Sequence, residues 1–106
     1  MPPDDDLDIA LITMTFQASD IDELLTVLSK YVVMTRNEAG CRNVDLCSSL
    51  SDAARVVVIQ KWESAEAARA HFDAPVMVEM AQSCVGILTG PPDIDLLEGI
   101  SAHDLA

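Results

Sequence analysis

Apolar and polar residues alternate along this chain with two different periods, and each change of period marks the boundary of a predicted element. Residues 9–16 are apolar and β-branched with threonines at alternate places, which predicts a strand. Beyond them apolar residues recur every three or four positions, with Ser19 as the expected N-cap and acidic residues in the first turn. This pattern predicts a helix that runs to about Asn37 and stops at Gly40.

The rest of the chain repeats the change from strand to helix. Two strands, a helix, a helical extension and a last strand are predicted over residues 41–50, 55–63, 64–73, 76–85 and 94–97. The short polar turn at 51–54 makes an antiparallel hairpin of the second and third strands. Ser64 caps the second helix, which must end before Pro75 because proline disfavours a helical conformation at the preceding residue.

The resulting order, βαββαβ, is that of the ferredoxin-like α+β fold, a four-stranded antiparallel sheet with its helices on one face. We expect one domain over residues 9–98, an acidic N-terminal tail over 1–8 and a C-terminal tail over 99–106. The length of 106 residues suits one domain and is too short for two.

The third predicted strand is apolar on both faces. Val57 and Ile59 point to one side of the sheet, and Val56 and Val58 point to the other. Such a strand needs apolar cover on both sides, and the helices supply only one of them. A second copy of the chain packed sheet to sheet would supply the other, so the sequence predicts a homodimer.

The charge of the chain excludes some classes of partner. It carries 18 acidic and 6 basic residues, a net charge of −12 at pH 7. Nucleic acids and anionic membrane surfaces are disfavoured as partners, because binding them requires clustered lysine and arginine. No apolar run reaches the roughly 18 residues of a membrane-spanning helix, and the acidic N-terminus lacks a signal-peptide pattern. We therefore expect a cytoplasmic protein.

The sequence holds no pattern typical of a metal or cofactor site. Its two histidines, His71 and His103, are not spaced as a ligand pair. It has no glycine-rich phosphate loop, and Gly90 is followed by two prolines, which have no amide hydrogen to donate. We therefore expect no metal and no flavin or nicotinamide cofactor.

The three cysteines, Cys41, Cys47 and Cys84, are odd in number and lack the spacing of a zinc site or a disulfide framework. No base lies close to them in the sequence that would activate a thiolate. We interpret them as small buried hydrophobic residues, with Cys41 and Cys47 on one face of the second strand.

The most informative local feature is Trp62, the only tryptophan, at the end of the third strand. The helix that follows carries His71 on its second turn. Ala67 and Ala68 on its first turn are small, which allows either tight helix–sheet packing or room for a ligand. Two interpretations stay open: Trp62 and His71 border a ligand pocket, or Trp62 anchors the core and His71 lies on the helix surface.

Three segments resemble the antibiotic biosynthesis monooxygenase family. They are Asn37–Glu38–Ala39–Gly40–Cys41, the run KWESAEAARAHF from Lys61 to Phe72, and Gly90–Pro91–Pro92–Asp93–Ile94. The second segment is the most specific, and the resemblance covers residues 9–97. It implies a dimeric α+β barrel and a likeness to quinol monooxygenases, which need neither metal nor flavin because the deprotonated substrate itself reduces oxygen.

The resemblance also implies a site. His71 becomes the candidate catalytic base. Trp62 matches the family's tryptophan as a catalytic residue and pocket wall. The implied substrate pocket consists of Trp62, Val58, Ala68, Phe72 and Val44.

Several polar residues of the family are absent. The asparagine, tyrosine and arginine of the polyketide-oxidising relatives fall on Val58, Ala68 and Gln82, and a further family tyrosine falls on Val44. The axial histidine of the haem-degrading relatives falls on Ala81, so the resemblance does not extend to haem.

Two functions therefore stay open on the sequence. One is a cofactor-independent monooxygenase that oxidises a small aromatic or quinol substrate with molecular oxygen. The other is a non-catalytic protein of the same fold that binds a small ligand or serves in a stress response. The absence of the family's polar residues favours the second, and the presence of Trp62 and His71 favours the first.

Overall fold

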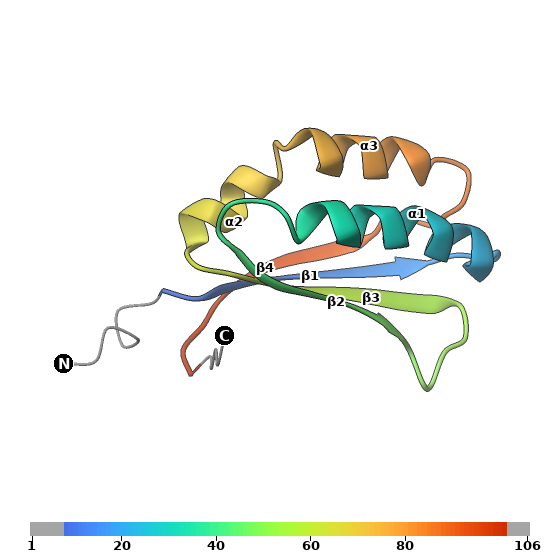
Figure 1. Ribbon diagram of the computed structural model, residues 1–106. Coiled ribbons are helices and arrows are strands. Elements are labelled where there is room, and N and C mark those ends of the chain that lie inside the picture. The colour runs from blue at the N-terminus through green and yellow to red at the C-terminus, as the bar shows by residue number, and fades with distance from the viewer. Residues whose placement is uncertain (1–7, 102–106) are drawn as a thin grey trace.

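The computed structural model describes residues 8–101 and places four strands and three helices along them (Figure 1). The strands are β1 (Ala10–Gln17), β2 (Cys41–Ser48), β3 (Arg55–Trp62) and β4 (Asp93–Glu98), and the helices are α1 (Ile21–Thr35), α2 (Ala65–His71) and α3 (Pro75–Ser83). The two expected tails lie mostly outside the described residues, and so does His103.

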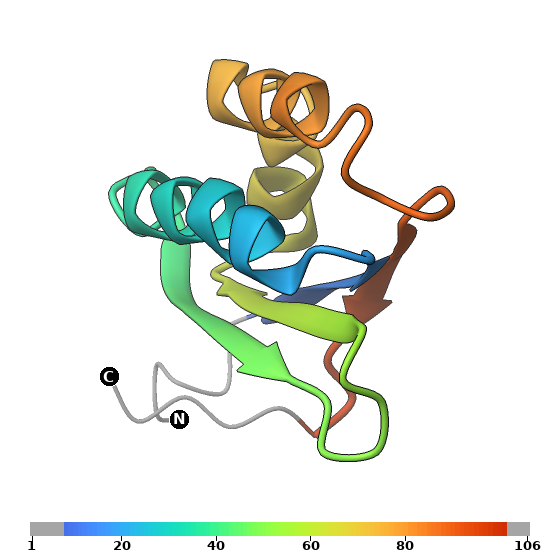
Figure 2. The same cartoon turned by 90° about the vertical axis from the view of Figure 1, so that its right-hand side faces the viewer.

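The four strands form one antiparallel sheet in the order β2-β3-β1-β4. All three helices lie on the same face of this sheet, and α1 and α3 run side by side above it (Figures 1 and 2). The ferredoxin-like α+β fold predicted from the sequence is therefore confirmed. Across residues 8–101, none of the helices is both long and apolar enough to cross a membrane.

The start of α1 differs from the prediction. The N-cap is Asp20 and not Ser19, because the Asp20 carboxylate accepts the backbone amide of Glu23 at 3.1 Å. A cap must be able to reach the amide three residues on, and Asp20 does so in an extended conformation. The helix also ends at Thr35, two residues before the predicted Asn37.

The core lies between the helices and the inward-facing residues of the two central strands. On β1 these residues include Ile12, Met14 and Phe16, and β3 contributes Val56 and Val58. Within residues 8–101 no helix lies over the opposite face of the sheet, which agrees with the uncovered face expected from the apolar pattern of β3 (Figure 2).

A β-bulge near the start of β2 changes which cysteines share a face. Cys41 pairs with Trp62 and Cys47 pairs with Val57, with a register shift between Cys41 and Asn43. Because Trp62 and Val57 point to opposite faces of β3, Cys41 and Cys47 also point to opposite faces, and the prediction of a shared face is wrong. The burial prediction holds for Cys84, but Cys41 is only half-buried and Cys47 is exposed.

Candidate functional site

A polar side chain sits in the middle of the apolar inner face of β3. Gln60 alternates in phase with Val56, Val58 and Trp62 and is fully buried. A buried amide has to find hydrogen-bond partners, because leaving it unpaired costs free energy. Gln60 meets Trp62 on its own strand and Tyr31 on α1: its Oε1 accepts the indole N–H at 2.9 Å, and its Nε2 donates to the Tyr31 hydroxyl at 2.6 Å.

The helix after β3 brings His71 to the same place. The Ser64 hydroxyl caps α2 by accepting the amide of Ala67 at 3.0 Å, and His71 is the last residue of this helix. Its side chain is fully buried, and its ring lies 4.9 Å from the indole of Trp62, centroid to centroid. The structure thus brings Trp62 and His71 together, and it places His71 in the core and not on the helix surface.

The turn after α1 supplies the fifth member of the cluster. Gly40 has a φ of +85°, and a Cβ at this position would lie 2.8 Å from the Cβ of Ala67. Only glycine allows both that backbone conformation and so close an approach to α2. The approach sets Glu38 beside His71, with Oε1 2.9 Å from the histidine Nδ1.

These contacts form one hydrogen-bond chain that runs through Trp62, Gln60, Tyr31, His71 and Glu38. The Tyr31 hydroxyl lies 2.6 Å from His71 Nε2, which completes the chain. An indole N–H can only donate and a carboxylate can only accept, so Gln60 Oε1 accepts from Trp62 and His71 Nδ1–H donates to Glu38, which leaves Nε2 of a singly protonated ring as an acceptor. The Tyr31 hydroxyl therefore donates to Nε2, and Nδ1–H of a neutral His71 donates to Glu38, a tautomer assigned from the network.

The Tyr31 hydroxyl is the buried centre of this chain. Burial raises the pKa of Tyr31 to about 12, against the opposing influence of the Gln60 hydrogen bond, so the phenol is neutral near pH 7. Two thioether sulfurs also surround it, Met14 Sδ at 3.5 Å and Met77 Sδ at 3.7 Å. The nearby Thr35 hydroxyl lowers this pKa, as Gln60 does, although its contact geometry falls short of a hydrogen bond.

At the other end of the chain the Glu38 side chain is 26% exposed, while that of His71 is fully buried. A proton that leaves Tyr31 through His71 would therefore arrive at a carboxylate in contact with water. This arrangement can accept a proton in the core and stabilise the resulting imidazolium with a carboxylate, which is the chemistry of a general base held in place by a third group.

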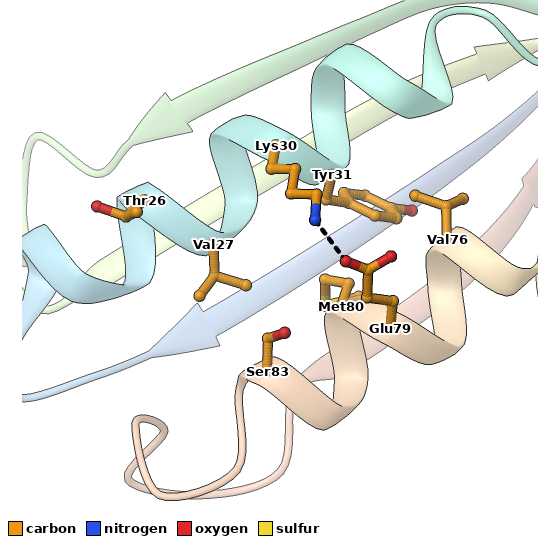
Figure 3. Close-up of a pocket in the computed structure, with 8 residues that line it drawn as sticks. All are labelled: Thr26, Val27, Lys30, Tyr31, Val76, Glu79, Met80 and Ser83. Carbon is orange, nitrogen blue, oxygen red and sulfur yellow. Dashed lines mark hydrogen bonds and ion pairs between the residues drawn. The ribbon is translucent and has the colours of Figure 1, made fainter.

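Tyr31 also connects this chain to a groove on the outside of the molecule. A groove of about 190 Å³ runs between α1 and α3 (Figure 3). Its lining residues are Thr26, Val27, Lys30, Tyr31, Val76, Glu79, Met80 and Ser83. Tyr31 is the most buried of them at 2% exposure; in Figure 3 its ring lies beside the ion pair of Lys30 and Glu79, and its hydroxyl end points toward Val76.

The pocket residues implied by the resemblance lie elsewhere. Trp62, Val58, Ala68 and Val44 are fully buried in the core, and Phe72 is half-buried against it. None of the five lines the groove between α1 and α3.

Three residues of the site were missed in the sequence. Gln60 had a visible signal, because it is polar at a buried position of an apolar strand. Tyr31 had a weaker one: it is the only tyrosine and lies in phase with Leu24 and Leu28 on the inner face of α1. Glu38 carried no signal of its own, since it appears only as part of a turn segment.

No cluster of metal ligands accompanies this site. Over residues 8–101, no group of three or more histidine, cysteine, aspartate or glutamate side chains is arranged to hold a metal ion. Both ring nitrogens of His71 are engaged by protein groups, Nε2 by the Tyr31 hydroxyl and Nδ1 by the Glu38 carboxylate.

The sequence matches a known family. The family model for antibiotic biosynthesis monooxygenase matches residues 9–83, which include Tyr31, Glu38, Gln60, Trp62 and His71. Among proteins of curated function, none matches the chain.

Solved structures share the fold over most of their length. Rv0793 from Mycobacterium tuberculosis superposes with a TM-score of 0.79 at 23% identity, covering 89% of this chain and 97% of that one. For PA3566 from Pseudomonas aeruginosa the TM-score is 0.77 at 22% identity, with coverages of 89% and 96%. A proposed antibiotic biosynthesis monooxygenase from Caulobacter crescentus gives 0.79 at 17%, with coverages of 90% and 92%. At such identities the likeness shows the fold alone.

Proposed function

Since this chain belongs to the antibiotic biosynthesis monooxygenase family, we propose that it oxidises a small phenol or quinol with molecular oxygen and without a bound cofactor. The observation that carries the proposal is the buried hydrogen-bond chain from Tyr31 through His71 to Glu38, which begins at the groove between α1 and α3. Oxygen accepts electrons readily from a deprotonated phenol, so the protein needs to remove a proton and stabilise an anion.

In this mechanism the substrate lies in the groove against the Tyr31 ring, and its hydroxyl reaches the buried Tyr31 oxygen when the Met77 side chain beside that oxygen moves aside. The substrate proton passes to Tyr31 as the tyrosine's own proton passes to His71 Nε2, and Glu38 stabilises the imidazolium through Nδ1. Gln60 holds the Tyr31 oxygen in place, and Trp62 holds Gln60. Trp62 thus acts as a positioning residue, and Tyr31 is the group that touches the substrate.

The electrons come from the substrate. The phenolate carbon bonds to oxygen to give a hydroperoxide, which loses water as the carbonyl forms. A phenol thereby becomes a quinone, with one atom of the oxygen molecule retained in the product and the other leaving as water.

The second candidate function is that of a non-catalytic small-ligand binder. The observation that favours it is the apolar character of Val58 and Ala68, which stand fully buried where polyketide-oxidising relatives have polar residues. A binder would use the same groove and would leave its ligand unchanged.

Oxygen consumption separates the two functions. With 1-naphthol or a simple benzoquinol as substrate, we expect oxygen uptake in a Clark electrode to be faster with the protein than in the protein-free control. One molecule of quinone should form for each molecule of oxygen consumed. Addition of a chelator should leave the rate unchanged. A rate equal to the protein-free control for every phenol that binds would establish the ligand binder instead.

We also propose that the chain is a homodimer that packs through the open face of its sheet. This face carries Leu11, Val57 and Ile59, which the helices do not cover, and Ile59 lies at its centre, opposite Thr13. Burying such a face removes apolar surface from water, which stabilises association.

Sedimentation should therefore give about twice the chain mass of 11.4 kDa at micromolar concentration. Ile59→Lys, which places a charge in the middle of the proposed interface, should shift the protein to the monomer mass. Val33→Lys is the matched control, because Val33 is exposed on α1, away from the sheet face. A folded wild-type monomer at these concentrations would contradict the dimer.

A further inference from the structure

The groove between α1 and α3 has the walls of a site for a flat apolar ligand. Val27, Val76 and Met80 form its sides, and the Tyr31 ring forms its floor (Figure 3). Its volume of about 190 Å³ lies below the roughly 300–1,000 Å³ of sites for drug-sized molecules. A ligand with one or two aromatic rings therefore fits it, and a larger polycyclic one does not.

One ion pair spans this groove. Lys30 on α1 and Glu79 on α3 meet beside the Tyr31 ring, with Nζ 2.6 Å from Oε1 (Figure 3). Both side chains are more than half exposed, at 66% for Lys30 and 53% for Glu79. Exposed pairs of this kind contribute little to stability, so a ligand can replace one partner at small cost.

Lys30 is also the only cationic side chain among the described residues that line the groove. A chain with a net charge of −12 repels anions at long range, so an anionic ligand needs a specific cation at its site. Lys30 directly precedes Tyr31, whose ring lines the groove and whose hydroxyl contacts His71. A proton acceptor and a cation on the same groove are the two groups that promote ionisation of a bound phenol.

We propose that Lys30 exchanges Glu79 for the anionic oxygen of the ligand, so that the groove selects aromatic molecules of one or two rings that carry a phenolate or a carboxylate. This inference rests on the proposed function, because it takes the groove to be the site of the ionised substrate. Glu79 holds the ammonium group over the empty groove and turns to water when the ligand enters.

The proposal predicts opposite effects for the two members of one ion pair. Binding of 2-naphthoate, which is not oxidised, is measured by calorimetry and compared with its uncharged analogue 2-naphthalenemethanol. Lys30→Gln should weaken naphthoate binding about two- to fivefold, and Glu79→Gln should strengthen it by a similar factor, because it removes the competitor for Lys30. Neither substitution should change binding of the alcohol, and both effects should shrink at high salt.

Two controls separate the pair from the overall charge. Lys30→Arg should keep most of the naphthoate affinity, since it keeps the positive charge. Glu66→Gln makes the same charge change as Glu79→Gln at an exposed position of α2 outside the groove, and it should leave naphthoate binding unchanged. Equal shifts for Glu66→Gln and Glu79→Gln would overturn the exchange, and so would no naphthoate binding by the wild type at millimolar concentration.

The same variants distinguish this inference from the proposed function. If naphthoate binding follows the charges of Lys30 and Glu79 but no phenol is oxidised, the anion site stands and the monooxygenase falls. If phenols are oxidised at rates that ignore both substitutions, the monooxygenase stands and the anion site falls.

Discussion

Replacing His71 with alanine should slow oxygen uptake by roughly 10²-fold or more, because removing a general base costs about two to four orders of magnitude in rate. It should also lower the free energy of unfolding. The Tyr31 hydroxyl would lose its acceptor in the core, which costs about 1–3 kcal/mol, and a cavity would add to that. Urea denaturation and initial rates measured on one preparation give both effects.

Because His71 is buried, its replacement lowers the measured rate both by removing the base and by unfolding part of the protein. Rates are therefore compared per folded molecule, at a temperature well below the midpoint of the variant. Glu38→Gln is the matched control, because its amide oxygen can still accept the Nδ1 hydrogen of His71 while the carboxylate charge is gone. It should slow the reaction less than His71→Ala does and leave stability nearly unchanged, since Glu38 is partly exposed.

Tyr31→Phe tests whether the substrate proton enters the hydrogen-bond chain through Tyr31. It keeps the ring that floors the groove and removes the hydroxyl between substrate and His71. If protons leave through Tyr31, this variant should be about as slow as His71→Ala while still binding 2-naphthoate. A His71→Ala variant that keeps the wild-type rate per folded molecule would end the assignment of His71 as the base.

The order of elements was predictable because local periodicity carries it. The β-branched run of β1, the capped α2 after Ser64 and the stop before Pro75 each depend on neighbours within a few residues. The bulge in β2 was not predictable in the same way. Strict alternation puts Cys41 and Cys47 on one face of the strand. A single extra residue between Cys41 and Asn43 places them on opposite faces instead.

The site was predictable only where one segment contains it. Trp62 and His71 lie nine positions apart across a strand–helix turn, so the sequence could bring them together. Tyr31 reaches His71 from 40 residues away, and Lys30 reaches Glu79 from 49. Those contacts depend on how α1 packs beside α2 and α3, which periodicity does not determine. The groove therefore had no sequence signal, although each of its walls belongs to a helix that was predicted.

Trp62→Ala should have the largest effect on stability of any single substitution considered, a loss of about 3–5 kcal/mol in the free energy of unfolding. The indole is 1% exposed and packs on His71 at 4.9 Å. Domains of this size are stable by only about 5–15 kcal/mol, so the variant would approach the limit of folding. Circular dichroism in urea is the suitable probe, because the substitution removes the only tryptophan and with it the fluorescence signal.

Trp62→Phe separates the core role of this residue from a role in ligand binding. Phenylalanine keeps an apolar ring but has no N–H, so Gln60 Oε1 would lose its donor, at a cost of about 1–3 kcal/mol. Gln60 would then be free to turn away from Tyr31, and oxygen uptake should fall with little change in naphthoate binding, because the indole does not line the groove. The opposite ranking, an unchanged unfolding free energy with naphthoate bound several-fold more weakly, would make Trp62 the wall of a ligand pocket, as the family resemblance implies.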